Sequence, residues 1–262
     1  MTAGVDSAKI TGERVMSPEG GFNPTWQRHV AAYGLAAPLL GPGRVLDLGC
    51  GVGHSFHLLA PRETVGVDIS AEALAGQERE THVADMRELP FAGGSFPSVL
   101  AVQSIEHVPD AERVLSEVAR VLEPDRDAIA IFVTPNRLTF GRPDEIIDPY
   151  HYVEYDADEL TTLCGHHFEQ VEPRGIFGSA RYMDLYEEER RRLDRLLAKD
   201  PLRLRRLVPM RGKQVLYDSM LRRARTESDP RAEAIEPSDF ELRGEGLDDA
   251  LDVVAICRHP RR

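Results

Sequence analysis

The sequence predicts an α/β fold with a doubly wound, mostly parallel sheet of seven strands. Short apolar runs rich in Val and Ile recur along the chain without polar alternation, as in strands that are buried on both faces of a parallel sheet. Helical patterns separate these runs, so the strands are expected to be joined by crossover connections. The seven expected strands are residues 44–49, 64–69, 82–86, 98–103, 128–134, 168–177 and 252–257.

The clearest of the expected helices covers residues 109–124. Val114, Leu115 and Val118 recur at helical spacing and share one apolar face, and Asp110 can cap the first turn. These features predict a crossover helix between the fourth and fifth strands. Further helices are expected at residues 25–40, 53–60, 71–79 and 156–168.

The chain is expected to form a single domain, residues 1–262, with a helical insertion at 187–230 before the last strand. Residues 187–226 hold 13 Lys or Arg against 6 Asp or Glu, in a chain whose net charge is -12. Such a segment is typical of solvated amphipathic helices, and it could form the contact of a homodimer. The alternative is a basic lid over an anionic or sugar-like substrate.

Composition limits the classes of partner and the compartment. The net charge of -12 opposes binding to phosphate backbones, which disfavours nucleic acid as a partner. Cys50, Cys164 and Cys257 are far apart and odd in number, as is typical of a reducing compartment. The N-terminal region lacks a signal-peptide pattern, and its longest apolar stretch is too short to span a bilayer. We therefore expect a soluble cytoplasmic protein with no membrane partner.

A glycine loop follows the first strand and is the most specific signal in the chain. The segment "VLDLGCGVGH" has the pattern D-x-G-x-G-x-G, formed by Asp47, Gly49, Gly51 and Gly53. Glycines at these positions let the backbone turn tightly and approach a ligand closely. A dinucleotide loop would need G-x-G-x-x-G, and His54 stands where its third glycine is required.

This loop resembles that of class I S-adenosylmethionine-dependent methyltransferases, which have a Rossmann-like fold. The resemblance implies that the loop lies against the methionine part and ribose of S-adenosylmethionine. Asp68, at the end of the second strand, can accept both ribose hydroxyls, and Asp85 resembles the family's acceptor for the adenine amine, with Met86 against the ring. The full set of expected cofactor contacts is Asp47, Gly49, Cys50, Gly51, Gly53, Asp68, Ile69, Asp85, Met86, Gln103 and Arg28.

Polar residues at the carboxyl end of the fourth strand predict the site of chemistry. The segment "QSIEHV" contains Gln103, Glu106 and His107, and His151 follows the fifth strand. An alcohol acceptor needs a base or a metal ion to lose its proton. Glu106, His107 and His151 are therefore the candidate catalytic residues.

The same residues resemble the E-x-x-E-H motif and later histidine of metal-dependent O-methyltransferases. The resemblance implies a divalent cation, Mg²⁺ or Mn²⁺, held by Glu106, His107, His151 and Gln103. Gln103 replaces the first acid of that motif, which weakens the expected hold on the ion. The alternatives are that the histidines act as a base or line the acceptor pocket without a metal, or that His107 is structural.

Several segments together resemble the actinobacterial sugar O-methyltransferases of methylmannose polysaccharide synthesis. They are "TGER" (11–14), "WQRH" (26–29), "IEH" (105–107), "TPNRLTF" (134–140), "DPYHYVEYDADEL" (148–160) and residues 237–256. The resemblance implies methylation of a sugar hydroxyl, with residues 1–40 closing over the cofactor. The alternative acceptors are a small aromatic or quinone-like molecule, a secondary metabolite and, less favoured, an RNA 2′-hydroxyl. A cofactor-binding module without catalysis is the alternative from another functional class.

Overall fold

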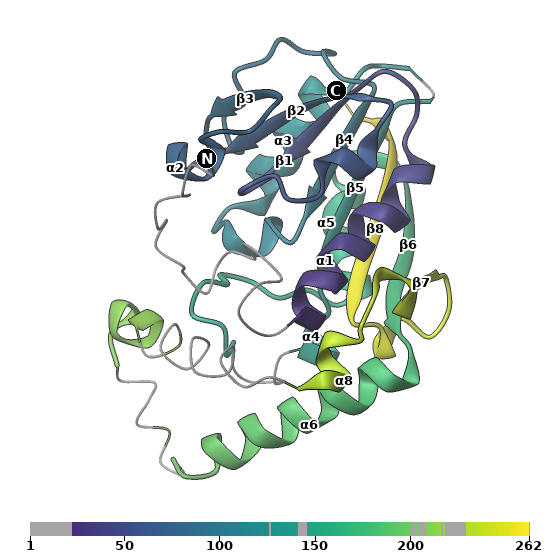
Figure 1. Ribbon diagram of the computed structural model, residues 1–262. Helices are drawn as coiled ribbons and strands as arrows, with labels where there is room; N and C mark the ends of the chain where they lie inside the picture. Colours follow the sequence, from purple (N-terminus) through teal and green to yellow (C-terminus); the bar gives the residue numbers. More distant parts are fainter. Residues whose placement is uncertain are drawn as a thin grey trace, which may run out of the picture.

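An eight-stranded sheet forms the centre of the protein (Figure 1). The computed structural model describes residues 23–125, 127–140, 146–200, 203, 208–215, 217 and 229–261. The strands lie in the order β3-β2-β1-β4-β5-β8-β6-β7. Their bounds are β1 (Arg44–Leu48), β2 (Glu63–Asp68), β3 (Glu80–Val83), β4 (Ser98–Val102), β5 (Ile129–Pro135), β6 (Phe168–Gly178), β7 (Phe240–Arg243) and β8 (Asp252–Pro260).

The sheet confirms the expected doubly wound, mostly parallel α/β fold. From β3 to β5 all neighbouring strands are parallel, whereas β8, β6 and β7 pair antiparallel with their neighbours. There is one strand more than the seven expected, because β7 pairs with the outer edge of β6. Only Phe240 is buried in the four residues of β7, so this strand lacks the apolar run that marks the others.

Two apolar cores cover the two faces of the sheet. One core contains the buried faces of α3 (Ala111–Val121) and α5 (Ala157–Gly165). The other contains the buried face of α1 (Asn23–Ala36). Every residue of β4 and β5 is buried between the cores, which explains why these strands have continuous apolar sequences.

The clearest helix of the sequence is present as α3. The Asp110 carboxylate accepts a hydrogen bond from a backbone N–H of the first turn, at 3.1 Å. Val114, Leu115 and Val118 are fully buried on the face that the spacing predicts. Asp110 is therefore a helix cap.

The remaining helical elements are short, apart from α6. No helix in the described ranges is long and apolar enough to cross a membrane. The elements are η1 (Ala37–Leu39), η2 (Phe56–Leu59), α2 (Ala71–Leu74), η3 (Ile105–His107), α4 (Arg137–Phe140), α6 (Ala180–Leu197), α8 (Pro230–Glu233), η5 (Pro237–Asp239) and η6 (Leu247–Asp249).

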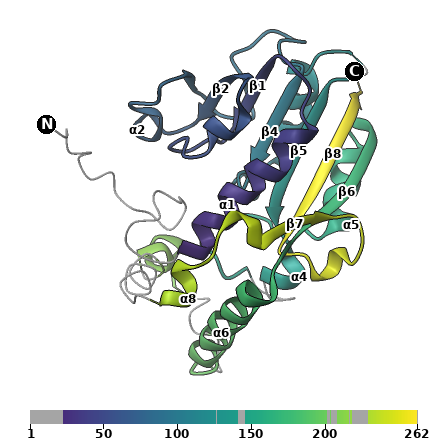
Figure 2. The same cartoon turned by 45° about the vertical axis from the view of Figure 1, so that its right-hand side comes forward.

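The expected insertion at 187–230 is described only in part. α6 begins before it and extends away from the sheet (Figure 2). A further helical stretch covers residues 210–215. Much of the basic segment, and the "TGER" stretch at 11–14, lie outside the described residues.

The start of α6 is fixed by Asp239 of η5. The Arg181 guanidinium donates two hydrogen bonds to the Asp239 carboxylate, both at 2.5 Å, and the Ser179 hydroxyl donates a third at 2.6 Å. The backbone N–H of Glu236 donates a fourth at 2.9 Å. Four donors on one buried carboxylate favour its charged form.

We expect Asp239→Asn to remove part of the acid sensitivity of folding. Hydrogen bonds from Arg181 lower the pKa of Asp239 from 3.8 to about 2. Because the folded-state pKa is depressed, the stabilisation is present above about pH 4 and is lost as pH falls toward 2. Urea unfolding at pH 6 and pH 3 should show a pH-dependent loss of unfolding free energy that is about 1 kcal/mol smaller in the variant than in the wild type. Asp158→Asn, at an exposed aspartate, is the control; equal pH dependence in all three proteins would contradict the expectation.

Candidate active site

A cavity of about 550 Å³ lies at the carboxyl ends of β1, β2 and β4. Its wall includes both His107 and His151, two of the three expected catalytic residues. The fold therefore places the expected chemistry beside the expected cofactor contacts. Eight of the eleven expected cofactor residues line the cavity: Gly49, Cys50, Gly51, Asp68, Ile69, Asp85, Met86 and Gln103.

The glycine loop turns at the end of β1 and is tied to β2. The backbone N–H groups of Gly49 and Cys50 both donate to the carbonyl oxygen of Val67, at 2.8 and 3.0 Å. Gly49 and Gly51 have φ angles of 72° and 54°, which glycine adopts without strain. A β-carbon on Gly49 would lie 2.4 Å from the β-carbon of Ser104, so this position also needs glycine for space.

Asp47 is buried next to the glycine loop, and its side chain does not line the cavity. Its carboxylate accepts a hydrogen bond from the Tyr33 hydroxyl at 2.8 Å and forms an ion pair with Arg79 at 2.8 Å. Both members of the ion pair are buried. Burial raises the pKa of Asp47, while Arg79 and Tyr33 oppose that rise. The cofactor contact expected of Asp47 stays a prediction, while in the structure its carboxylate binds Tyr33 of α1 and Arg79.

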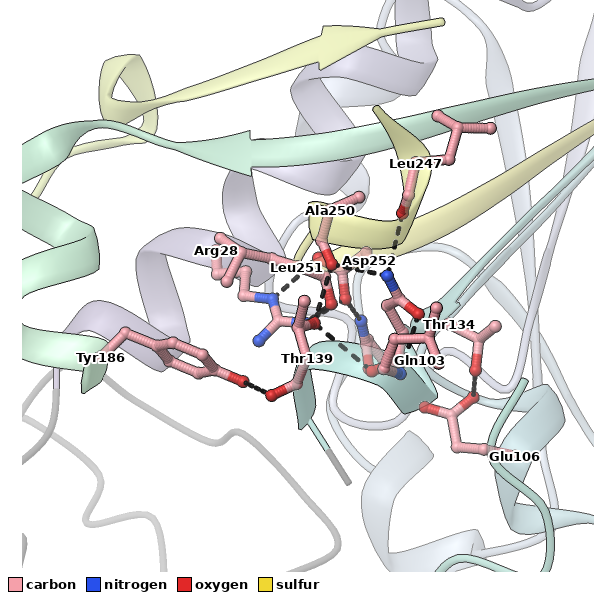
Figure 3. A network of polar contacts seen from close by, with 12 residues as sticks. Arg28, Gln103, Glu106, Thr134, Thr139, Tyr186, Leu247, Ala250, Leu251 and Asp252 are labelled. Carbon is pink, nitrogen blue, oxygen red and sulfur yellow. Dashed lines mark hydrogen bonds and ion pairs between the residues drawn. The ribbon is translucent and has the colours of Figure 1, made fainter. Parts of the chain in front are cut away.

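Gly53 and Arg28, two further expected cofactor contacts, each lie against other parts of the protein. A β-carbon on Gly53 would lie 2.3 Å from the amide oxygen of Gln77, so that amide occupies the space beside the glycine. Arg28 is buried and donates to Asp252 and to the backbone oxygen of Leu251 (Figure 3). Neither Gly53 nor Arg28 lines the cavity.

The two strand-end carboxylates, Asp68 and Asp85, both lie in the cavity wall. Asp68 accepts hydrogen bonds from the backbone N–H groups of Gly51 at 2.9 Å and Ser70 at 2.8 Å. Its carboxylate therefore links the end of the second strand to the glycine loop. Asp85 forms an ion pair with Arg87 at 2.6 Å, and hydrogen bonds from Arg87 lower the pKa of Asp85. Both side chains are therefore oriented at the cavity edge.

Glu106, His107 and His151 come together although 43 residues separate the first pair from the last. Each offers one possible ligand atom, and these atoms all lie within 4.8 Å of one another. The two imidazole rings meet edge to face, with centroids 5.0 Å apart. Glu106 is buried behind the cavity wall, where the Thr134 hydroxyl donates to its Oε2 at 2.9 Å (Figure 3). Gln103, the fourth expected ligand, instead donates its side-chain amide to Asp252 at 2.6 Å.

Both histidines are oriented by oxygen atoms at their Nδ1 positions. His107 Nδ1 lies 3.1 Å from the backbone oxygen of Tyr150, and His151 Nδ1 lies 3.1 Å from Glu154 Oε1. If each Nδ1 carries the proton, each Nε2 keeps a lone pair. Burial alone lowers the pKa of His151, but Glu154 and other carboxylates raise it above its ordinary value.

The sequence reasoning did not identify Asp148 and Glu154, which are both buried beside His151. Asp148 stands three residues before His151 and Glu154 three residues after it, and this spacing was the sequence signal that could have identified them. His29, the last residue of the "WQRH" segment, and His54 also line the cavity, and neither was among the candidate site residues. Burial lowers the pKa of both of these imidazoles, that of His54 to about 4, so this part of the wall is uncharged at neutral pH.

Comparison with known proteins decides the family. A family model described as a methyltransferase domain matches residues 46–129, which contain the glycine loop and both strand-end carboxylates. A probable S-adenosylmethionine-dependent methyltransferase of Mycobacterium tuberculosis is 31% identical over 271 residues, covering 96% of this chain and 89% of the relative. The chain belongs to the S-adenosylmethionine-dependent methyltransferases. It is an enzyme of this type, and S-adenosylmethionine is its cofactor.

Other proteins that are similar to this methyltransferase are named for different kinds of acceptor atom. A ubiquinone/menaquinone biosynthesis C-methyltransferase of Desulfotalea psychrophila is 36% identical over 44% of this chain and 50% of the relative. A chloroplastic tocopherol O-methyltransferase of Arabidopsis thaliana is 31% identical over 41% of this chain and 34% of the relative. The fold is shared with a possible histamine N-methyltransferase of Thermotoga maritima, with a TM-score of 0.60, 18% identity and coverage of 91% and 92%. Family membership alone therefore leaves the acceptor open.

Substitution of two loop glycines should separate steric from conformational effects in this methyltransferase. We expect Gly49→Ala to lower the unfolding free energy by about 3 kcal/mol, because the new β-carbon meets Ser104 in a left-handed backbone. Gly51→Ala has only the conformational cost, about 1 kcal/mol, since no atom lies within 4 Å of the position that its new β-carbon would take. Urea unfolding measures the loss of unfolding free energy in each variant. Calorimetric titration measures the affinity of each variant for S-adenosylhomocysteine. An equal loss in the two variants would contradict the steric argument.

Proposed function

We propose that the enzyme transfers a methyl group from S-adenosylmethionine to a hydroxyl of a saccharide or another small molecule. The observation that carries the proposal is the cluster of Glu106, His107 and His151, whose two histidines line the same cavity as the glycine loop. A hydroxyl must lose its proton to attack efficiently, and such a cluster can accept that proton. A neutral amine already carries a lone pair and has less need of such a group.

The order of the strands supports a placement for the cofactor. Asp85, Asp68 and the glycine loop follow β3, β2 and β1, which are neighbours in the sheet. In our proposal, Asp85 accepts from the adenine amine, Asp68 accepts from the ribose hydroxyls, and the loop lies against the methionine part. Bound S-adenosylmethionine supplies the electrophilic methyl group, and the protein supplies orientation and electrostatics. The His107 and His151 side of the cavity is then left for the acceptor.

The histidines are proposed to handle the acceptor proton. With its Nδ1 proton donated to the Tyr150 carbonyl, His107 keeps a lone pair on Nε2 that can take the hydroxyl proton. Glu106 and Glu154 are buried carboxylates near the two imidazoles, and negative charge there stabilises the imidazolium that results. His151, whose pKa these carboxylates raise, is suited to orient the hydroxyl oxygen by donating a hydrogen bond.

The same cluster fits a divalent cation such as Mn²⁺ or Mg²⁺. Glu106 Oε1 is a buried oxygen that has no hydrogen-bond partner among the described residues. The carboxylate of Glu154 on His151 is the kind of partner that orients a metal-binding imidazole. Glu106, His107 and His151 would hold the ion. Such an ion lowers the pKa of a hydroxyl bound to it.

A panel of acceptors tests the proposal directly. Methyl transfer from labelled S-adenosylmethionine should be measured on mannosides and on phenols, with EDTA present and absent. We expect transfer to a hydroxyl acceptor, and a requirement for the cation would appear as loss in EDTA that is restored by excess Mn²⁺ or Mg²⁺. Transfer to nitrogen or carbon acceptors only would overturn the proposal.

A small aromatic or quinone-like acceptor is the second candidate. Tyr150, Tyr152 and Met210 line the cavity, and such side chains pack well against an aromatic ring. Met210 belongs to residues 187–230, which supports a role of that segment in acceptor choice, as a lid, over a role in a dimer contact. RNA is less favoured because the net charge is -12. The phenol arm of the panel separates this candidate from the saccharides.

A further inference from the structure

Arg28 and Asp252 form a buried ion pair that joins α1 to the first residue of β8 (Figure 3). Arg28 Nε donates to Asp252 Oδ2 at 2.7 Å, and Nη2 donates both to Oδ1 and to the backbone oxygen of Leu251. Asp252 is 0% exposed and Arg28 is 8% exposed. Burial alone lowers the pKa of Arg28, but Asp252 raises it above its ordinary value, so the guanidinium stays charged. The pair is a fixed anchor beneath the cavity.

Gln103 binds to this anchor through one end of its side chain. Its Nε2 donates to Asp252 Oδ1 at 2.6 Å. A carboxylate that pairs with a guanidinium can only accept hydrogen bonds, so the amide must present its NH₂ group to Asp252. The carbonyl oxygen is then the other end of the amide, and no hydrogen bond to it is found among the described residues. Gln103 also lines the cavity.

The backbone of Gln103 is held in an unusual conformation. Its φ angle is 50°, in the left-handed region that residues other than glycine adopt at a cost. Its backbone N–H donates to the carbonyl oxygen of Val133 at 2.8 Å, so the residue stays attached to β5. Side chain and backbone are thus fixed by separate contacts. Strain of this kind is typical of positions that serve a site.

We propose that Asp252, held by Arg28, is a positioning residue that turns the carbonyl oxygen of Gln103 toward the ammonium group of the methyl donor's methionine part. The proposal rests on the cofactor placement proposed above. Gln103 directly follows β4, which lies next to β1 on the side away from β2 and Asp68, so Gln103 comes after the glycine loop in the order of the strands. The uncharged carbonyl accepts from the ammonium, and the ion pair behind it adds no net charge.

Binding of two ligands tests whether Gln103 contacts the methionine part. S-adenosylhomocysteine carries the ammonium group, whereas 5′-methylthioadenosine has the same adenosine and thioether without it. Gln103→Met keeps the side-chain length and removes the carbonyl. We expect calorimetric titration to show a loss of about tenfold to a hundredfold in affinity for S-adenosylhomocysteine and no change for 5′-methylthioadenosine. Gln170→Met, at an exposed glutamine of β6, is the matched control.

A donor–acceptor exchange tests the positioning role of Asp252. Asp252→Asn lets the Gln103 amide flip. The variant should therefore have a lower affinity for S-adenosylhomocysteine and an unchanged affinity for 5′-methylthioadenosine. The double variant Gln103→Glu with Asp252→Asn keeps one negative charge in the group of Arg28, residue 103 and residue 252, and lets the new amide at position 252 donate to the new carboxylate at position 103, whose other oxygen faces the ammonium. We expect it to regain wild-type affinity within about threefold, a rescue that a merely structural role does not predict. Circular dichroism verifies that each variant is folded.

Three results would overturn the inference. The first is an equal change in affinity for the two ligands, or no change for either, in Gln103→Met. The second is a folded double variant that shows no recovery. The third is a wild-type enzyme that binds neither ligand, which would overturn the proposed cofactor placement as well and so differs from the first two.

Discussion

His107→Ala should lower the rate constant of methyl transfer about a hundredfold to ten-thousandfold, the usual contribution of a general base. The lost group is the imidazole that the Tyr150 carbonyl orients toward Glu106 and His151. Affinity for S-adenosylhomocysteine should stay within about twofold of the wild type, because His107 is not among the proposed cofactor contacts. Single-turnover transfer to the best acceptor and calorimetric titration measure the two effects separately.

The matched control is His166→Ala. His166 is an exposed histidine that lies 2.8 Å from Glu112, away from the cavity, and its removal should leave transfer unchanged. His151→Ala should resemble His107→Ala, because both imidazoles belong to one cluster. If transfer survived in both cavity variants, the proposed role of the cluster would be wrong.

Asp47→Asn should lower the free energy of unfolding by about 3 kcal/mol, because it leaves the buried guanidinium of Arg79 without its counter-charge. The variant also weakens the hydrogen bond from Tyr33. For a chain of this size the change corresponds to a melting temperature lower by about 6–12 °C. Urea unfolding followed by circular dichroism measures the first quantity, and a thermal scan the second.

Glu63→Gln provides the comparison with an exposed ion pair. Glu63 lies 3.1 Å from Arg44, and the side chains are 65% and 38% exposed. Solvent screens such a pair, so its loss should change the free energy of unfolding by about 0.5 kcal/mol or less. If Asp47→Asn cost no more than Glu63→Gln, the buried pair would not be what holds the glycine loop in place.

Much of the site was predictable because parallel strands end at the same edge of a sheet. Apolar runs located the strands, and Asp68, Asp85, Gln103 and His107 each follow one of them. Their common position in the cavity wall then follows from topology alone. The helix α3 was predictable for a different reason, because a cap and an apolar stripe are properties of residues that are close together in the sequence.

What the sequence could not show is which partner each buried polar group takes. Asp47 lies within the glycine motif, yet its partners Tyr33 and Arg79 come from other segments. Arg28 was expected at the cofactor, but its partner Asp252 is 224 residues away. Pairings at such separations depend on the packed fold, and no local pattern encodes them.

The contacts between η3 and the loop around Tyr150 are made largely by the main chain. The backbone N–H of Tyr152 donates to the carbonyl oxygen of Glu106 at 2.8 Å, and the Tyr150 carbonyl accepts from His107. Main-chain groups are the same whichever side chains stand at positions 150 and 152. We therefore expect that substitutions of these two tyrosines change which acceptor the cavity accommodates and leave the position of the His107 imidazole unchanged.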